Sequence, residues 1–288
     1  MPGSFRLMGI VNVTPDSFSD GGRFLDPAEA IARGRTLVAE GADILDVGGE
    51  STRPGAEPVS ETEELRRVLP VVEGLAELGV RAQVSIDTSK ASVARAAIDA
   101  GASLVNDVSA FRGDPEMAGL VARSGADCCL MHMRGQPRTM QDDPRYEDVV
   151  DDVKAFLSER LEFAVREGVA RERILLDPGI GFGKNETHNL ELLRRLAELG
   201  DLGAPIVIGT SRKGFLGRIL ARAAGRAEPV DVEGRLAGTV ASNVLAYERG
   251  ASVFRVHDVA PVREALAVTA ATLGERWTAR SMGTTPAS

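Results

Sequence analysis

A unit of four parts recurs along this chain: a short apolar run, a polar loop, a stretch with helical periodicity and a glycine. Each run is apolar over nearly its whole length, often with β-branched residues, which is typical of a strand buried on both faces. The runs span residues 7–13, 44–48, 83–87, 104–108, 129–133, 174–177, 206–209 and 253–256. Because helical stretches such as 91–98 and 149–161 separate them, the pattern predicts an α/β fold of parallel strands joined by amphipathic helices.

The predicted helices have recognisable ends. Asp26, Pro27 and Glu29 supply an N-cap, a first-turn proline and a capping-box partner, and Ser60 with Glu63 repeats the box. A glycine closes most helical stretches a few residues before the next strand, as a left-handed residue after a helix does. These glycines are Gly41, Gly79, Gly101, Gly125, Gly168, Gly200 and Gly250.

Polar residues follow almost every predicted strand, and their distribution distinguishes two parallel-sheet architectures. An open sheet places its site at the switch point between two or three strand ends, whereas a barrel brings all strand ends to one mouth. The strand-end residues are Asn12, Asp46, Glu50, Asp87, Asn106, Asp107, His132, Asp177, 211–213 and 255–258. We therefore predict a single-domain (β/α)8 TIM barrel over residues 1–275, followed by a disordered tail at 276–288.

Composition limits the classes of function. The longest apolar runs, such as 68–72 and 128–131, are far shorter than the roughly 18 residues of a membrane span. The N-terminus also lacks a signal-peptide pattern, so we expect a cytoplasmic protein with no membrane partner. A net charge of -8 argues against a nucleic-acid partner, which needs a broad basic face. Cys128 and Cys129 are adjacent in an apolar run and point to opposite faces of a strand, so we interpret them as core residues rather than a disulfide.

Three carboxylates are predicted at interior strand ends. Burial of Asp46, Asp87 and Asp177 is costly unless hydrogen bonds or opposite charges compensate it. Together with Asn106 they form an acceptor-rich group suited to a flat heterocycle that presents several N–H donors. For the set we favour ligand binding, although any single member can have a structural role instead.

Basic side chains follow the last two predicted strands, a place where many barrels bind phosphate. Lys213, Arg255 and His257 are candidates to neutralise a diphosphate and to stabilise it as a leaving group. Arg255 and His257 are two positions apart, so on a strand they share a face. Arg212 follows the same strand, and it either joins these cations or forms a structural ion pair instead.

The glycine-rich segment 177–184 is neither of the common nucleotide-binding motifs. Asn185 replaces the Ser or Thr of a phosphate loop, and Lys184 replaces the third glycine of a dinucleotide fold. The histidines lack metal-ligand spacing, so we expect no protein-caged transition metal. A Mg2+ ion held mostly by diphosphate and water needs only one or two protein oxygens, and Asn12 is placed to supply one.

Two polar, glycine-bearing loops, 14–22 and 51–55, either close over a substrate or are simply solvated. Segments 8–22 and 46–55, which contain them, match the two signatures of the dihydropteroate synthase family, and the chain closely resembles that family. Further matches extend the resemblance to about residue 275; they lie at 85–88, 106–107, 131–133, 177–184, 210–213 and 255–259.

The resemblance implies a TIM-barrel enzyme of folate synthesis, a homodimer, that joins 6-hydroxymethyl-7,8-dihydropterin diphosphate to 4-aminobenzoate and releases diphosphate. The implied residues of the pterin site are Asp46, Asp87, Asn106, Met131, Asp177 and Lys213. Those implied around the diphosphate are Thr52, Arg255, Val256 and His257, with Asn12 at the Mg2+ position. The implied pocket for 4-aminobenzoate and sulfonamides comprises Phe18, Arg53, Pro54, Phe182 and Lys213.

A loose, dissociative substitution is the mechanism we infer. Lys213, Arg255, His257 and Mg2+ draw off diphosphate, while Asp20 resembles the family carboxylate that stabilises a cationic pterin-methyl intermediate. The pterin is expected to bind first. Gly214 departs from the family pattern, which commonly has serine there, but a helix that starts at this point offers its free backbone N–H groups to the substrate carboxylate.

Two alternatives share an acidic pterin pocket. A methyltransferase that uses methyltetrahydrofolate need not bind diphosphate, so the basic segments 211–213 and 255–257 favour the synthase. A pterin-binding paralogue that has lost the reaction usually has broken loops, whereas both loop signatures are intact in this chain.

Overall fold

The computed structural model describes residues 5–14, 26–51, 56–77, 79, 81–135 and 139–274. Five residues with roles predicted from the family resemblance lie outside this part of the chain; they are Phe18, Asp20, Thr52, Arg53 and Pro54. The predicted disordered tail at 276–288 lies outside it too.

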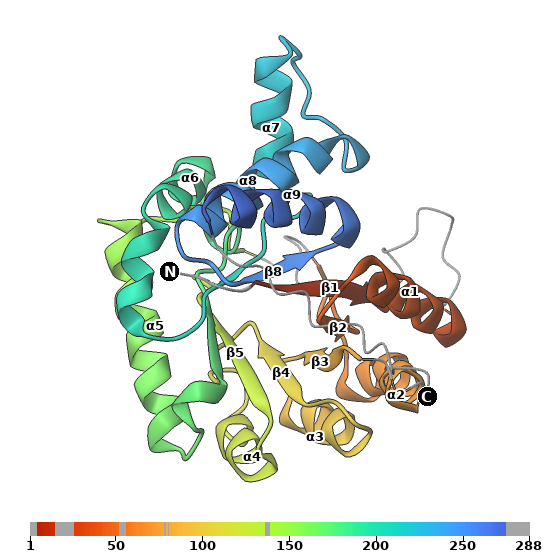
Figure 1. Ribbon diagram of the computed structural model, residues 1–288. Coiled ribbons are helices and arrows are strands. Elements are labelled where there is room, and N and C mark those ends of the chain that lie inside the picture. Colours follow the sequence, from red (N-terminus) through yellow and green to blue (C-terminus); the bar gives the residue numbers. More distant parts are fainter. Residues whose placement is uncertain are drawn as a thin grey trace.

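Strands and helices alternate along the described chain, as the repeated sequence unit predicts (Figure 1). The strands are β1 (Arg6–Asn12), β2 (Ile44–Gly48), β3 (Gln83–Asp87), β4 (Leu104–Asp107), β5 (Asp127–Met131), β6 (Ile174–Asp177), β7 (Val207–Ile208) and β8 (Val253–Val256). The helices are α1 (Pro27–Glu40), α2 (Glu61–Glu77), α3 (Ala91–Asp99), α4 (Met117–Ser124), α5 (Val149–Arg166), α6 (Glu186–Arg194), α7 (Gly214–Ala223), α8 (Leu236–Glu248) and α9 (Val259–Thr272). Short 3-10 helices are η2 (Arg171–Arg173), η3 (Leu196–Leu202) and η4 (Glu233–Arg235).

The eight strands form one parallel sheet in the order β6-β5-β4-β3-β2-β1-β8-β7. Its two edges meet, because Leu176 of β6 forms a parallel bridge with Ile206 and donates its N–H to the Pro205 carbonyl oxygen at 3.0 Å. The predicted TIM barrel is confirmed. All eight predicted strands are present, but several boundaries differ: β1 begins and ends one residue earlier than predicted, β4 ends one residue earlier, β5 is shifted two residues toward the N-terminus, and β7 keeps only two residues.

Two apolar layers hold the barrel together. The larger one lies between the strands and the surrounding helices and includes Leu45, Ile86 and Cys128. The smaller one, which we call the plug, fills the barrel interior with residues from seven strands: Met8, Ile44, Leu104, Cys129, Leu175, Val207 and Val253. Cys128 and Cys129 are both buried and unbonded and belong to different layers, as predicted.

The helix ends largely follow the sequence signals. Asp26 caps α1 by accepting the Ala28 N–H at 2.9 Å, and Ser60 Oγ accepts the Glu63 N–H at 3.3 Å. Gly200 was predicted wrongly as a helix end. It lies inside η3, and Gly203, with φ of 68°, takes the left-handed position that ends this helix.

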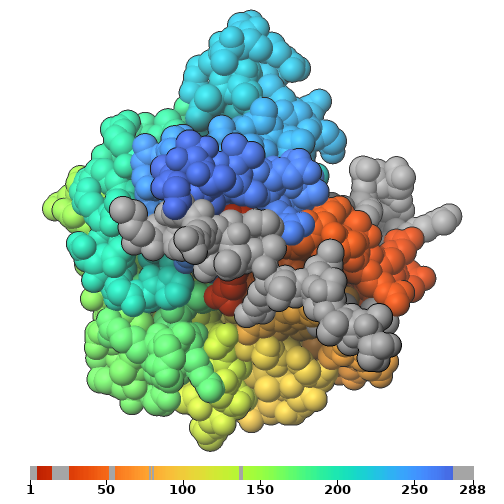
Figure 2. All heavy atoms as spheres, viewed as in Figure 1, coloured from red at the N-terminus to blue at the C-terminus, as the bar shows by residue number. Residues whose placement is uncertain are grey.

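The α7 helix and the segment after it project beyond the ring of the other helices (Figure 1 and Figure 2). Among the described residues, no helix combines the length and apolar character needed to cross a membrane.

Candidate active site

A polar layer lies directly above the plug. Side chains alternate between the two faces of a strand, so a residue two positions after a plug residue also faces the barrel interior. Asp46, Asn106, Asp177 and Arg255 each follow the plug residue of their own strand by two positions and therefore also face the interior. In register, Asp87 lies opposite Asn106 and Met131 opposite Asp177. The four residues predicted as one acceptor-rich group, Asp46, Asp87, Asn106 and Asp177, thus lie in one interior layer, whereas Glu50, Asp107 and His132 have partners elsewhere.

Asp46 is the centre of a buried hydrogen-bond network in this layer. Its Oδ2 accepts from Arg255 Nε at 2.6 Å and from Asn106 Nδ2 at 3.0 Å. Its Oδ1 accepts from Ser85 Oγ at 2.6 Å. Arg255 also donates through Nη2 to Asp87 Oδ2 at 2.7 Å. Asp46 is fully buried and its oxygens already have three donors, so its principal role is to orient Asn106 and Arg255.

A second group forms around the loop after β6. Asp177 Oδ1 accepts the Gly179 N–H at 2.6 Å. Lys213 Nζ donates to the Ile180 carbonyl oxygen and lies 4.5 Å from the centroid of the Phe182 ring. Phe182 in turn packs against a methionine cluster that contains Met131. The residues predicted for the pterin and for 4-aminobenzoate are therefore adjacent here.

Burial dominates the electrostatics of the site. It raises the pKa of Asp87 to about 7, against the opposing effect of Arg255, and it raises the pKa of Asp177, against that of Lys213. Burial also lowers the pKa of Lys213 to about 8 although Asp177 favours the charged form. For Arg255, burial opposes ionisation, but Asp46 and Asp87 outweigh it and hold the pKa above its ordinary value. Arg255 is thus a permanent cation, whereas Lys213 is a cation that titrates.

The residues predicted around the diphosphate have different surroundings in the structure. His257 follows the last residue of β8, with Nδ1 3.0 Å from Ser211 Oγ. Arg255 reaches down to the carboxylates, and the Val256 side chain is fully buried in the outer apolar layer. Only the backbone of Val256 is therefore available to a ligand. Arg212 forms the structural ion pair considered as its alternative, with two bonds of 2.8 and 2.5 Å to Asp258.

Asn12 ends β1 and is partly exposed. No group of three or more His, Cys, Asp or Glu side chains in the described part of the chain could hold a metal ion. The residues present therefore fit a Mg2+ ion only if substrate and water supply most of its ligands, with one amide oxygen from the protein.

Two residues of the site were not identified from sequence. Ser85 precedes Asp87 by two positions, so period-2 alternation alone indicates that it faces inward toward Asp46. Lys184 is 2% exposed, and its Nζ contacts His132, Gly179 and Phe182. In the sequence it is a lysine in a glycine-rich segment, and this pattern does not indicate which groups its amine contacts.

Comparison with known proteins agrees with this geometry. Residues 8–257 match the family model described as pterin binding enzyme. The dihydropteroate synthase of Mycobacterium leprae is 49% identical over 269 residues, which cover 93% of each chain. The chain belongs to the dihydropteroate synthase family.

Solved structures of dihydropteroate synthase from Xanthomonas albilineans have the same fold. The structure with 4-aminobenzoic acid superposes with a TM-score of 0.85 at 47% identity and covers 94% of this chain and 93% of that one. The structure in complex with 7,8-dihydropteroate gives a TM-score of 0.82 at 43% identity, with 95% of each chain covered.

Proposed function

We propose that this chain condenses 6-hydroxymethyl-7,8-dihydropterin diphosphate with 4-aminobenzoate, giving 7,8-dihydropteroate and diphosphate. One observation carries the proposal: an interior acceptor group (Asp87, Asn106 and Asp177) lies beside Lys213 and Arg255 at one barrel mouth. A heterocycle that presents N–H donors matches the acceptors, and a diphosphate matches the cations. The relatives solved with 4-aminobenzoic acid and 7,8-dihydropteroate support both halves of the reaction.

Pterin binding would use the oriented acceptors. Asp46 fixes the amide of Asn106, and Arg255 fixes the carboxylate of Asp87, so neither acceptor needs to reorganise around the ring. Asp177 is held in the same way by the Gly179 N–H. Charge on these carboxylates strengthens their bonds to ring N–H groups.

The substitution breaks the C–O bond between the pterin methylene and diphosphate and forms a C–N bond to the arylamine, which then loses a proton. Lys213, Arg255 and His257 would stabilise the negative charge that develops on the departing diphosphate. In a loose transition state the methylene becomes cationic, and Asp20 is proposed to stabilise it. A Mg2+ ion at Asn12 would supply further neutralisation of the diphosphate.

The 4-aminobenzoate pocket would be formed by Phe182 and Lys213 with the predicted loop residues. The α7 helix begins at Gly214, with Lys213 as its N-cap. The first N–H groups of a helix have no intrahelical partner and attract anions. We propose that they receive the substrate carboxylate where the family commonly places a serine hydroxyl.

We further propose a cytoplasmic homodimer that binds no nucleic acid. The helical surface carries exposed apolar side chains, including Leu236 and Leu245 on α8 and Val268 on α9, which a second copy would bury. The net charge of -8 disfavours a polyanion partner. Sedimentation velocity tests the dimer: a single species at the monomer mass at micromolar concentration would refute it.

Diphosphate release tests the reaction. The purified chain is incubated with the pterin diphosphate and Mg2+, with and without 4-aminobenzoate, and both diphosphate and dihydropteroate are quantified. Equimolar release that depends on 4-aminobenzoate is the expected result. Tight pterin binding without product would indicate the degenerate paralogue, and transfer of a methyl group from methyltetrahydrofolate would indicate the methyltransferase.

A further inference from the structure

We propose that Lys184 is a positioning residue that holds the loop of residues 178–183 in the conformation required for 4-aminobenzoate binding. The inference rests on the proposed function, because it assigns a role within that active site. The Lys184 amine contacts the backbone of Phe182 but none of the side chains predicted to bind substrate; it acts through the loop that carries Phe182 and contacts Lys213.

The amine of Lys184 is buried and fully coordinated. Nζ lies 3.0 Å from the Gly179 carbonyl oxygen, 3.0 Å from that of Phe182 and 2.8 Å from His132 Nδ1. The His132 carbonyl oxygen lies 3.4 Å away as a fourth acceptor, so each N–H of the amine has a partner. Burial lowers the pKa of Lys184, and Asp177 opposes this shift.

His132 completes the arrangement as a neutral acceptor. Burial, followed by the charge of Lys184, lowers the pKa of His132 to about 2, so its ring carries one proton at neutral pH. For Nδ1 to accept from Lys184, that proton must be on Nε2. The ring is also packed edge-on against Phe156, with centroids 4.8 Å apart. The histidine is thus a fixed anchor on the segment after β5.

Within the loop, the backbone forms one turn, in which the Phe182 N–H donates to the Gly179 carbonyl oxygen at 3.0 Å, so the loop also needs anchors from outside. Gly179, Gly181 and Gly183 all have positive φ, at 65°, 83° and 62°, and the loop lies between β6 and α6 without regular structure. A Cβ on Gly179 or Gly183 would collide with the backbone of His132 or Arg134, so the loop packs directly on the segment after β5. Glycine-rich backbone loses much entropy when it is ordered, and the lysine offsets this cost.

A second set of contacts holds the loop from outside. Tyr146 Oη donates to the Gly183 carbonyl oxygen at 2.8 Å, and Gln141 Nε2 donates to that of Gly181 at 2.5 Å. Asn189 of α6 accepts the Gly181 N–H at 2.7 Å. These residues come from the β5–α5 connection and from α6, so the loop is held between two elements.

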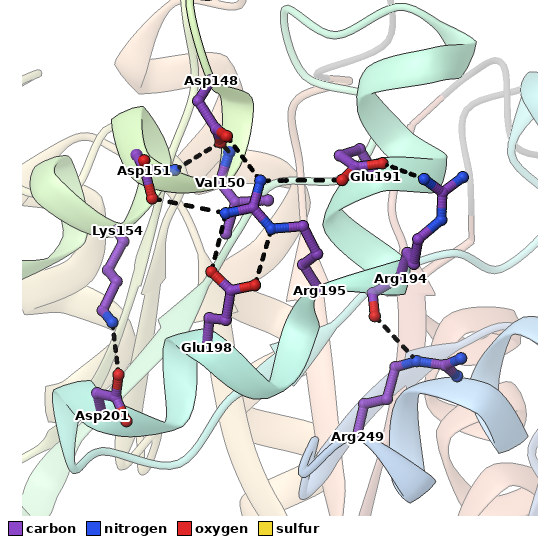
Figure 3. Close-up of polar contacts among 10 residues, drawn as sticks. All are labelled: Asp148, Val150, Asp151, Lys154, Glu191, Arg194, Arg195, Glu198, Asp201 and Arg249. Carbon is purple, nitrogen blue, oxygen red and sulfur yellow. Dashed lines mark hydrogen bonds and ion pairs between the residues drawn. The ribbon is translucent and has the colours of Figure 1, made fainter.

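The two elements are themselves tied by Arg195, just after α6 (Figure 3). Its Nη1 donates to Asp148 Oδ2 at 2.6 Å, and Asp148 is the N-cap of α5. Arg195 also pairs with Glu198 at 2.7 Å and with Glu191 at 3.8 Å. The segments that hold the loop, from the β5–α5 connection through α6 to η3, are therefore bonded to one another.

The position of three site groups depends on this loop. Gly179 supplies the N–H that holds Asp177, Ile180 supplies the carbonyl oxygen that receives Lys213, and Phe182 lies beside the Lys213 amine. Asp177 is also fixed by its place at the end of β6, whereas Phe182 has no strand or helix to hold it. Loss of Lys184 should therefore affect 4-aminobenzoate more than pterin.

The test compares Lys184→Met, which keeps most of the side-chain volume, with Tyr146→Phe, which removes one hydroxyl. Lys154→Met is the matched control, since Lys154 pairs with Asp201 on the surface of α5. Steady-state kinetics give kcat and the KM for 4-aminobenzoate, and calorimetry gives the Kd for the pterin diphosphate with Mg2+. Wild-type protein is measured in parallel, so an inactive wild type would refute the proposed function, separately from this inference.

We expect Lys184→Met to raise the KM for 4-aminobenzoate about tenfold, equivalent to about 1.4 kcal/mol, and the pterin Kd by less than about threefold. Tyr146→Phe should shift the same KM by about threefold with an unchanged pterin Kd, and Lys154→Met should change neither. Equal losses for both ligands, or an unchanged KM in folded Lys184→Met, would overturn the proposal. If Lys184→Met does not fold, Tyr146→Phe decides: an unchanged KM overturns the proposal and a selective increase supports it.

Discussion

Replacing Arg255 with methionine should leave two carboxylates inside the barrel without their cation. Asp46 is fully buried and Asp87 nearly so, and each accepts one short bond from this guanidinium. Asp46 would keep Ser85 and Asn106 as neutral donors. Removing one partner of a buried ion pair costs about 3–5 kcal/mol, and we expect Arg255→Met to lose stability in this range at pH 8.

The loss should depend on pH, with a definite sign. Without the guanidinium, burial and the nearby charge of Asp46 raise the folded-state pKa of Asp87 further above its unfolded value. A group with a raised folded pKa contributes stability below its unfolded pKa and loses it as the pH rises through the folded pKa. Because the pKa of Asp87 is already about 7 beside Arg255, the variant's deficit should shrink substantially between pH 8 and pH 5.

Urea denaturation at the two pH values measures this effect. The control is Arg145→Met, which removes an exposed pair with Asp143 and should cost less than about 1 kcal/mol at either pH. A deficit for Arg255→Met that equals the control, or that is the same at pH 5 and pH 8, would refute the reasoning. The first result would mean that the buried carboxylates do not need the guanidinium, since Ser85 and Asn106 still donate to Asp46, and the second that Asp87 does not take up a proton between these pH values.

Further predictions concern the titration of Lys213, the buried ion pair of Lys90, the Mg2+ site and the role of Asp20. Activity should fall as the pH rises through about 8, where Lys213 loses its proton, and Lys213→Arg should move this limb to higher pH; a limb that does not move would contradict the assignment. Lys90 binds both Glu50 and the fully buried Glu64 at 2.5 Å, so Lys90→Met should destabilise the fold by about 3 kcal/mol in urea, and Glu64→Gln in the same chain should recover part of this loss. Asn12→Ala should weaken the Mg2+ dependence of pterin diphosphate binding by calorimetry while leaving binding without Mg2+ unchanged; equal loss under both conditions would argue against a metal contact. Asp20→Ala should reduce kcat without an equal loss of pterin affinity, and unchanged turnover in a product assay would exclude the proposed role.

Local sequence patterns predicted the barrel because each strand carries its own signal. The alternation within β2 and β8 was enough to place Asp46 and Arg255 on the interior face. What could not be predicted is that Arg255 pairs with Asp46, which is 209 positions away and meets it only when the sheet closes. Pairings of this kind are a property of the assembled barrel and not of any local segment.

Side-chain roles were harder to predict than positions. Asp107 was grouped with the strand-end residues, yet it accepts from Ser109 and Phe111 and shapes the loop in which Ala110 and Phe111 have positive φ. For the histidines, the sequence predicted only that they do not cage a metal; the His188 ring accepts the Asn185 N–H in a capping box. In both cases the chemistry of the residue type permits several roles, and only the local backbone selects one.

The apolar plug below the polar layer gives the barrel a closed end. Its side chains are at most 3% exposed, so within the described residues the interior can be reached only from the mouth. The acceptors proposed for the pterin lie deeper, and Phe182 and Lys213 lie nearer the mouth, on the loops that follow β6 and β7. Two reactants that share a single entrance must pass in sequence: the one that occupies the floor enters first, and 4-aminobenzoate bound ahead of it would stand in its path. We propose that the order of binding is set in this way by the shape of the fold, before any difference in affinity is considered.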